Sequence, residues 1–213
     1  MGATSLGFYN RYILPRVLDN AMRRSVLDAE RQKVISEASG NVLEIGFGSG
    51  LNLPYYPAHV KNITAVEPDA GMRARALDRI AASGKTVSVI ARGLERDKRL
   101  PIAEASVDTV VSTWTMCSIA DPTAAMKEIY RVLKKGGRFL FVEHGLAKDP
   151  EVAVWQHRLS PITRKFGGGC NLDRDIEKIV TDSWLEIDRL DKYYLTKGLR
   201  VGAYTYRGVG IKY

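Results

Sequence analysis

The sequence predicts an α/β fold built on a seven-stranded mixed sheet with helices on both faces. Short apolar segments rich in β-branched residues alternate with helical segments between residues 41 and 145. Such alternation is typical of a parallel sheet. Two segments of alternating polarity, 184–193 and 201–211, then close the chain and resemble antiparallel strands, so that the last strand runs against the others. The length of 213 residues suits one domain.

The first forty residues are expected to form one or two helices. Apolar side chains recur at helical spacing between Phe8 and Ala38, and Pro15 is expected to interrupt the helical pattern. We interpret residues 1–40 as an N-terminal helical lid.

The core, residues 41–145, is expected to hold five strands and two helices. The strands are predicted at 41–46, 63–66, 86–90, 109–113 and 138–143, and the helices at 70–82 and 121–134. Asp121 followed by Pro122 is a good helix start, and Gly136–Gly137 is a good stop.

After Gly145 the pattern changes, but the chain is still interpreted as a single domain. Residues 146–172 are interpreted as an insertion that holds a helix and a glycine-rich loop. Residues 173–213 are expected to form a last helix, with Asp173 as its N-cap, and the two closing strands, joined by a turn at Gly198.

The composition excludes several classes of protein. Apolar residues make up 45% and charged residues 26%, unlike disordered or fibrous chains. The two cysteines, Cys117 and Cys170, are too few for a disulfide framework, and no Cys/His spacing matches a zinc motif, so no metal is predicted. No apolar run approaches the roughly 20 residues of a membrane span, and the first residues lack the pattern of a secretory signal. We therefore expect a cytoplasmic protein.

The net charge of +8 raises the question of a nucleic-acid or membrane partner. The excess of basic residues is spread along the chain rather than gathered in a tail. This distribution favours an ordinary soluble surface.

A glycine-rich loop is the strongest local signal. The apolar segment from Val42 runs into Gly46, Gly48 and Gly50, which let a backbone turn tightly and approach a ligand. The pattern alone also fits a dinucleotide loop or a closely packed turn. Glu67, at the end of the next strand, is placed to accept hydrogen bonds from a ribose diol, or is a solvated loop acid. The third glycine comes one residue too early for a pyrophosphate loop, which favours a ligand such as S-adenosylmethionine.

These segments and two others resemble the class I S-adenosylmethionine-dependent methyltransferases, in particular their type 11 group. The family's first motif resembles VLEIGFGSG at 42–50, and its ribose-binding acid resembles AVEPD at 65–69. Two further blocks resemble LPIAEASVDTVVSTWTMCSI at 100–119 and RVLKKGGRFLFVEH at 131–144. The resemblance implies a Rossmann-like fold, S-adenosylmethionine as cofactor, and methyl transfer as the reaction.

A narrower resemblance covers nearly the whole chain. The segments YNRYILP at 9–15, GGCNLDRD at 168–175 and YRGVG at 206–210 are similar to a branch of small bacterial methyltransferases and animal thiol S-methyltransferase-like proteins. That branch implies a compact acceptor such as a thiol.

The methionine part of the cofactor is expected to lie along the glycine loop. Gly46, Gly48 and Gly50 are expected to let the backbone pass beneath it. Glu44 is expected to orient the loop or the cofactor's amino group, or else to be a strand-end acid paired with a nearby cation. Thr113, after the fourth strand, is expected near the methionine moiety.

The adenosine part is expected at the end of the second and third strands. Glu67 is expected to hold the ribose, and Pro68 and Met72 to flank the adenine. The backbone of Leu94 and the side chain of Glu95 are expected near the adenine amino group, since the usual Gly-Asp pair is missing there.

Four residues are expected at the acceptor. His144 ends the fifth strand at the edge where parallel sheets place their chemistry, and is the candidate general base, or else a structural histidine. Cys117 and Cys170 are candidate pocket residues, or inert thiols. Trp155 is a candidate apolar wall, or ordinary packing.

The leading function is methyl transfer to a small-molecule acceptor, a thiol or phenol. The alternative is a lipid-like acceptor, a phospholipid amine or quinone, at a membrane surface that the N-terminal helices contact peripherally. A binding module without catalysis is a third reading. Nucleic acid is not an expected partner, because Thr113–Met116 does not match the motif of base-methylating enzymes. The sequence leaves the oligomeric state open.

Overall fold

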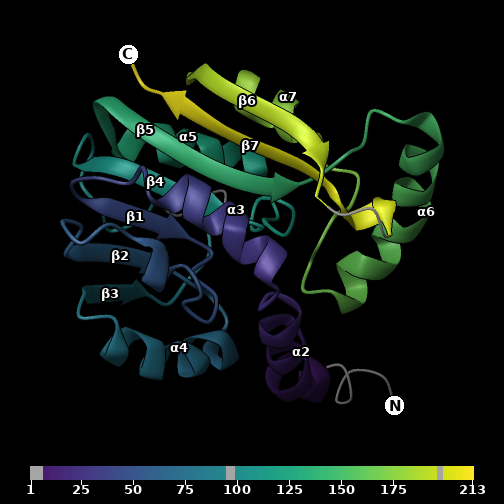
Figure 1. Ribbon diagram of the computed structural model, residues 1–213, viewed down its shortest axis with the longest axis horizontal. Helices are drawn as coiled ribbons and strands as arrows, with labels where there is room; N and C mark the ends of the chain where they lie inside the picture. Colours follow the sequence, from purple (N-terminus) through teal and green to yellow (C-terminus); the bar gives the residue numbers. More distant parts are fainter. Residues whose placement is uncertain (1–6, 95–98, 196–198) are drawn as a thin grey trace.

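Seven strands form one mixed sheet in the computed structural model, which describes residues 7–94, 99–195 and 199–213 (Figure 1). The strand order is β3-β2-β1-β4-β5-β7-β6. The strands are β1 (Val42–Ile45), β2 (Asn62–Val66), β3 (Thr86–Ile90), β4 (Val107–Thr113), β5 (Leu133–His144), β6 (Glu186–Tyr194) and β7 (Tyr204–Ile211). The first five pair in parallel, and β7 is antiparallel to both of its neighbours. The predicted fold class is confirmed.

Helices cover both faces of this sheet. They are α2 (Leu14–Ala21), α3 (Ser25–Ile35), α4 (Ala70–Ala82), α5 (Pro122–Val132), α6 (Pro150–Phe166) and α7 (Ile176–Thr181). A π-helical turn, η1 (Tyr9–Ile13), leads into α2, and the 3₁₀ turns are η2 (Leu53–Tyr55) and η3 (Arg200–Gly202). Among the described residues, none of the helices has both the length and the apolar character of a bilayer span.

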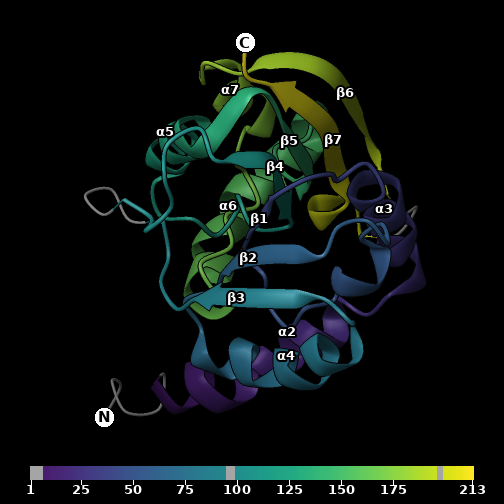
Figure 2. The ribbon, with the colours of Figure 1, turned by 90° about the vertical axis from the view of Figure 1, so that its left-hand side faces the viewer.

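Alternation along the central strands divides the core into two layers. Val110 of β4 packs in one buried cluster with side chains of α5 and α7, whereas the next residue, Val111, packs in the other with side chains of α3 and α4. Successive side chains of a strand point to opposite faces, so a nearly continuous apolar strand serves both layers. Figure 2 shows α5 and α3 on opposite sides of the central strands.

The N-terminal helical segment changes from η1 to α2 at Leu14, next to Pro15, which lies in the first turn of α2. A proline is tolerated there because the first amides of a helix have no internal partner. The segment is interrupted a second time, between Ala21 and Ser25. The last helix begins at Ile176, capped by Asp175, whose side chain accepts from Lys178 N at 2.9 Å. Asp173, the expected cap, instead accepts from Ser160 and pairs with His157. The turn predicted at Gly198 lies outside the described residues.

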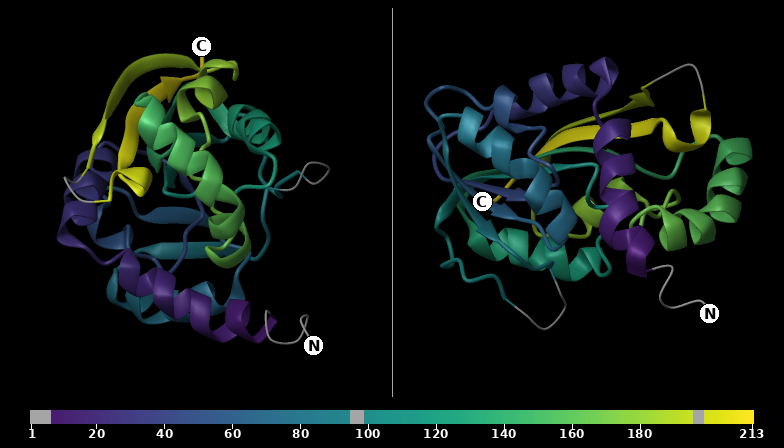
Figure 3. Two further views of the ribbon diagram at one scale, coloured as in Figure 1. Left: turned by 90° about the vertical axis from the view of Figure 1, so that its right-hand side faces the viewer. Right: turned by 90° about the horizontal axis from the view of Figure 1, so that it is seen from below.

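The carboxyl ends of the parallel strands meet at one edge of the sheet, and α2 and α6 lie beyond it (Figures 1 and 3). The two helical segments are close, because Tyr9 Oη donates to the carbonyl of Phe166 at 3.0 Å. Ligands of open α/β sheets bind at this edge.

Candidate functional site

A cavity of about 750 Å³ opens at the carboxyl edge of the sheet. Its walls come from the glycine loop, the ends of β2 and β4, the helices α2 and α3, and the loop after α6. The volume lies in the range of small-molecule and cofactor sites. Ten of the fourteen predicted site residues line this cavity.

The glycine loop forms the floor of the cavity. Gly46, Gly48 and Gly50 have positive φ angles of 71°, 58° and 79°, where side chains are disfavoured. A Cβ on Gly46 would also overlap the side chain of Thr115. Gly46 and Gly48 line the cavity, whereas Gly50 turns the chain behind it. The glycines therefore let bare backbone face a ligand.

Glu67 lies at the end of β2 and closes one side of the loop. Its Oε2 accepts from Gly48 N at 2.7 Å, and its Oε1 accepts from Asp69 N at 2.8 Å. The side chain is 7% exposed, and burial raises the pKa of the carboxyl despite these two bonds. Each carboxylate oxygen can accept more than one hydrogen bond, so Glu67 can also receive the hydroxyls of a sugar.

Pro68, Met72 and Leu94 line the cavity beside Glu67. Their apolar surfaces suit the faces of a heterocyclic base. Asp69 caps α4 by accepting from Met72 N at 2.7 Å, which fixes Met72 over the loop. Glu95 falls outside the described residues.

Glu44 does not face the cavity directly. It is fully buried in β1 and accepts from Asn52 Nδ2 at 2.8 Å and from Tyr56 Oη at 2.6 Å. Burial raises the pKa of Glu44 to about 7, and the bonds from Tyr56 and Asn52 oppose that rise. Asn52 lines the cavity and also contacts Thr113 Oγ1, at 3.0 Å from Nδ2. Glu44 therefore orients Asn52, which the sequence analysis missed.

Arg31 of α3 is a second cavity residue that the sequence analysis missed. Its Nε donates to Asn52 Oδ1 at 3.1 Å, and Nη1 donates to Met22 O and Asp28 Oδ1. The guanidinium stacks over Trp114 at 5.0 Å from the ring centre. Among the described residues Nη2 has no hydrogen-bond partner, so a cation with a free donor lines the cavity.

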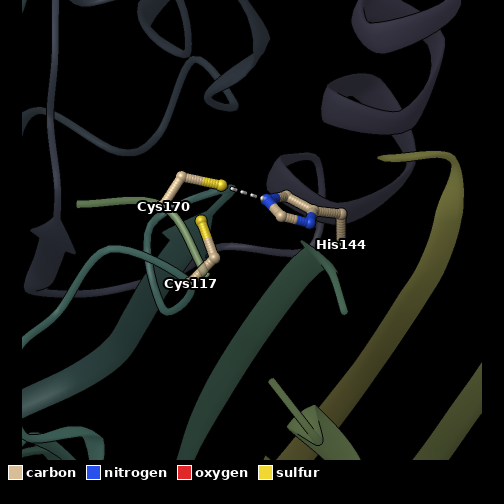
Figure 4. Close-up of side chains that lie close together, drawn as sticks. All are labelled: Cys117, His144 and Cys170. Carbon is tan, nitrogen blue, oxygen red and sulfur yellow. Dashed lines mark hydrogen bonds between the residues drawn. The ribbon is translucent and has the colours of Figure 1, made fainter. Parts of the chain in front are cut away.

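Cys117, His144 and Cys170 meet at the other end of the same cavity (Figure 4). Cys170 Sγ lies 3.2 Å from His144 Nε2. The two sulfurs and a ring nitrogen all lie within 4.8 Å of one another. Figure 4 shows the three side chains pointing toward a common point.

The charges of this cluster are coupled. A hydrogen bond from Cys170 and the charge of His144 lower the pKa of the Cys117 thiol, against its burial. Burial lowers the pKa of His144, but the charge of Cys117, the hydrogen bond with Cys117 and the charge of Glu143 together outweigh burial and raise it. The hydrogen bond to Cys117 and burial raise the pKa of Cys170. One thiol of the pair is thus favoured as a thiolate.

Glu143, next to His144 in β5, was not predicted. It is fully buried, and Oε1 accepts from Ser112 Oγ at 2.7 Å and from Thr115 N at 3.1 Å. Burial, followed by the charge of Cys117, raises the pKa of Glu143 to about 8. Its bonds hold the segment between β4 and Cys117 against β5.

Trp155 does not reach the cavity. Its side chain is 53% exposed, and Arg158 lies over its ring. On α6 the inward positions belong to Val152 and Gln156, whose side chain bonds Ala147 N, Gly145 O and Val201 O. The helical phase therefore directs Trp155 to the outside.

The chain is similar in sequence to proteins of known function. Residues 43–141 match the family model described as a methyltransferase domain. The chain is 35% identical over 146 residues to a thiol S-methyltransferase of Rattus norvegicus, covering 64% of this chain and 58% of that protein. It is 28% identical over 153 residues to a phosphatidylethanolamine N-methyltransferase of Cereibacter sphaeroides, covering 72% and 73%. The chain spans about three fifths of the length of the curated thiol S-methyltransferases that it matches.

The fold has solved counterparts as well. A SAM-dependent methyltransferase from Aquifex aeolicus superposes with a TM-score of 0.63 and 19% identity, over 93% of this chain and 98% of that one. The cavity offers a ligand a bare glycine loop, the buried carboxylate of Glu67 and the guanidinium of Arg31. The matched domain, the strand order and the sequence motifs agree, and residues 43–141 are a methyltransferase domain of the type 11 group, in a fold that S-adenosylmethionine-dependent methyltransferases share.

Proposed function

We propose that this protein transfers a methyl group from S-adenosylmethionine to the sulfur of a small, partly apolar thiol. One observation carries the proposal: a single cavity joins the glycine loop and Glu67 to the cluster of Cys117, His144 and Cys170. The relatives named as thiol S-methyltransferases support a sulfur acceptor.

The residues of the cavity fit the cofactor part by part. Glu67 binds the ribose hydroxyls, while Pro68 and Met72 enclose the adenine, together with Leu94. Arg31 Nη2 binds the carboxylate of the amino-acid part, and Asn52 binds beside it. When bound, S-adenosylmethionine supplies a methyl group on a positively charged sulfur.

The acceptor end is enclosed by apolar side chains. Leu14 and Leu18 of α2 line the cavity beside Gly168, in the loop that carries Cys170, and Leu27 of α3 and Ile119, two residues after Cys117, also line the cavity. An apolar enclosure excludes water from the attacking sulfur and holds it in line with the methyl carbon. The described part of residues 1–40 supplies three of these four apolar side chains, and Thr163, Gly167 and Gly168 of the 146–172 segment line the same cavity. We propose that both segments close over the bound ligands.

His144 is the residue that we place at the acceptor sulfur. The general-base role predicted from the sequence remains a prediction.

Two measurements test the proposal. Calorimetry is expected to show binding of S-adenosylhomocysteine and no binding of NAD, because the loop lacks a pyrophosphate-type third glycine. Turnover is then measured against panels of thiols, phenols, amines and lipids, and we expect thiols to lead. Binding of NAD in place of S-adenosylhomocysteine would refute the cofactor, and a panel led by amines would refute the acceptor.

A lipid-like acceptor is the second candidate, and the surface beside the cavity favours it. Phe8 precedes η1, Tyr12 and Ile13 lie on η1, and Val17 lies on α2; all four are exposed large side chains, and Phe166 of α6 is exposed close by. These segments also carry basic side chains, as do amphipathic helices that lie in the membrane interface. Sedimentation with vesicles of anionic phospholipid tests this candidate: Tyr12→Ser combined with Val17→Ser is expected to abolish cosedimentation, whereas exchange of the distant, exposed Trp184 for Ser is not.

A further inference from the structure

The acceptor cluster has the composition of a metal site. Its three donors are two thiol sulfurs and an imidazole nitrogen, all within 4.8 Å of one another. They come from three separate segments: Cys117 follows β4, His144 ends β5, and Cys170 follows α6. Each of the three lines the cavity, so the cluster has an open side.

The backbone holds the two cysteines together without help from their thiols. Asn171 donates to the carbonyl of Cys117 twice, from its backbone N at 2.9 Å and from Nδ2 at 2.8 Å. Thr163 Oγ1 donates to the carbonyl of Cys170 at 2.8 Å. Gly169, at a φ of 86°, lets the loop approach Ser118 so closely that a Cβ would lie 3.2 Å from its carbonyl oxygen. The donors are therefore preorganised.

We propose that Cys117, His144 and Cys170 bind one Zn²⁺ ion and leave its fourth coordination position open to the cavity. Zinc takes two thiolates and an imidazole readily, and catalytic zinc sites keep three protein ligands. A tetrahedral site with ordinary zinc bond lengths places its donors about 3.5–3.8 Å apart. The 3.2 Å between Cys170 Sγ and His144 Nε2 requires only a small outward movement of these side chains.

The charge balance favours a divalent ion. Two thiolates neutralise Zn²⁺, so the loaded site carries no net charge in a cavity with apolar walls.

A catalytic role for the ion rests on the proposed function. In this role the acceptor thiol occupies the open coordination position of the ion. Coordination breaks its S–H bond, and the proton leaves to solvent. The acceptor sulfur then forms a bond to the methyl carbon as the bond from that carbon to the sulfonium sulfur breaks. The electron pair of the broken bond stays on the cofactor sulfur, which becomes neutral. The methylated acceptor is a thioether, a weak ligand, and departs. In this role His144 is a metal ligand rather than a base.

Metal binding by the full chain is the first test. Reduced protein freed of metal with a chelator is titrated with Zn²⁺, and metal content is measured by elemental analysis after gel filtration. We expect one ion per chain. The exchanges C117S, C170S and H144A are expected to weaken zinc binding about 100-fold or more, beyond the loss caused by outer-shell changes. His59→Ala is the matched control, since His59 is exposed and distant in sequence from the cluster, and it is expected to bind zinc normally.

Co²⁺ in place of Zn²⁺ provides a spectroscopic readout of the ligands. We expect the visible bands of tetrahedral Co²⁺ and a near-ultraviolet thiolate-to-cobalt band that weakens in C117S and C170S. Thiophenol is expected to intensify that band by adding a third thiolate. No metal uptake by the reduced wild type, uptake that the three exchanges leave unchanged, or a cobalt spectrum that does not respond to thiophenol would each overturn the inference.

S-adenosylhomocysteine binding separates failure of this inference from failure of the proposed function. If zinc-free protein binds S-adenosylhomocysteine but methylates thiophenol only after zinc is restored, both stand. If zinc-free protein methylates thiophenol at the full rate, the metal role is wrong and the function stands. If neither form binds S-adenosylhomocysteine, the proposed function is wrong, and the acceptor role of the ion fails with it, even where zinc is bound.

Discussion

Asp19 of α2 accepts a hydrogen bond from the hydroxyl of Ser49 in the glycine loop, at 2.6 Å between Oδ1 and Oγ. Asp19 is 1% exposed and also pairs with Arg79 of α4 at 3.0 Å and with Arg23 at 2.7 Å. Arg79 returns a bond to the carbonyl of Ser49 at 2.6 Å. The carboxylate of Asp19 therefore joins α2, the glycine loop and α4.

Asp19→Ala is expected to destabilise the protein by about 1–3 kcal/mol, because it leaves the buried hydroxyl of Ser49 without its acceptor and the partly exposed Arg23 and Arg79 without their partner. It is also expected to speed amide hydrogen exchange in α2 and to weaken S-adenosylhomocysteine binding. Urea unfolding, exchange mass spectrometry and calorimetry measure the three effects. Asp182→Ala is the control: its pair with Lys178 is exposed on both sides, and its loss is expected to change stability by less than about 0.5 kcal/mol. Equal behaviour of the two variants would refute the role of Asp19.

Glu67→Gln is expected to weaken S-adenosylhomocysteine binding by about 1.5–3 kcal/mol, since it removes charge-assisted hydrogen bonds to the ribose. Calorimetry on folded protein measures the change. Glu186→Gln, at an exposed position on the edge strand β6, is expected to leave the dissociation constant unaltered. A folded Glu67→Gln variant with wild-type affinity would mean that the ribose is held elsewhere.

Arg31→Lys is expected to weaken S-adenosylhomocysteine binding about tenfold, because lysine cannot keep the bonds of Nε and Nη1 and also reach a carboxylate. Methylthioadenosine lacks the amino-acid part of the cofactor, so its binding is expected to stay within about twofold of wild type. The pair of ligands serves as the internal control. An equal loss for both ligands would show that Arg31 supports the cavity wall rather than the carboxylate.

Glu44 is expected to make stability depend on pH between 4.5 and about 7. Below pH 4.5 the folded and unfolded states both hold the proton, and the site contributes no difference. As the pH rises the unfolded carboxyl ionises first, because the folded pKa is raised to about 7, so stability falls through this window and levels off above it. Urea unfolding across this range measures the fall, and Glu44→Gln is expected to show a smaller one. Parallel curves for the two proteins would contradict the raised pKa.

Local patterns made the fold and the cofactor end predictable. The central strands β1 and β4 are buried along almost their whole length. The turns that carry Gly46 and Glu67 follow strands directly, so neighbours in the sequence are neighbours in the site. The N-cap of α7 was harder to predict, because Asp173 and Asp175 both stand just before the helical segment and either could cap it. Only the backbone decides that Asp175 caps α7 while Asp173 turns to Ser160.

The other site residues depend on contacts that no local pattern encodes. Asp19 and Arg31 lie on helices in a sequence rich in charge, where a polar side chain normally faces water, yet both are buried against the cofactor loop. Cys117, His144 and Cys170 are separated by more than twenty residues each, far from any zinc motif. They meet because Gly169 and Asn171 bring the loop after α6 onto the segment after β4.

The tight contact between Gly46 and Thr115 fixes the distance between the two ends of the cavity. Gly46 begins the loop beneath the donor, and Thr115 lies two residues before Cys117 at the acceptor end. A Cβ atom on Gly46 would overlap Thr115, so the two segments are already in close contact. Gly46 follows β1 and Thr115 follows β4, and these strands pair through four residues each. The distance between the two segments therefore cannot change unless β1 moves against β4. The sheet thus fixes the distance between the donor end and the acceptor end of the cavity. Under the proposed function, selectivity among acceptors depends on how far each acceptor sulfur reaches toward the methyl donor.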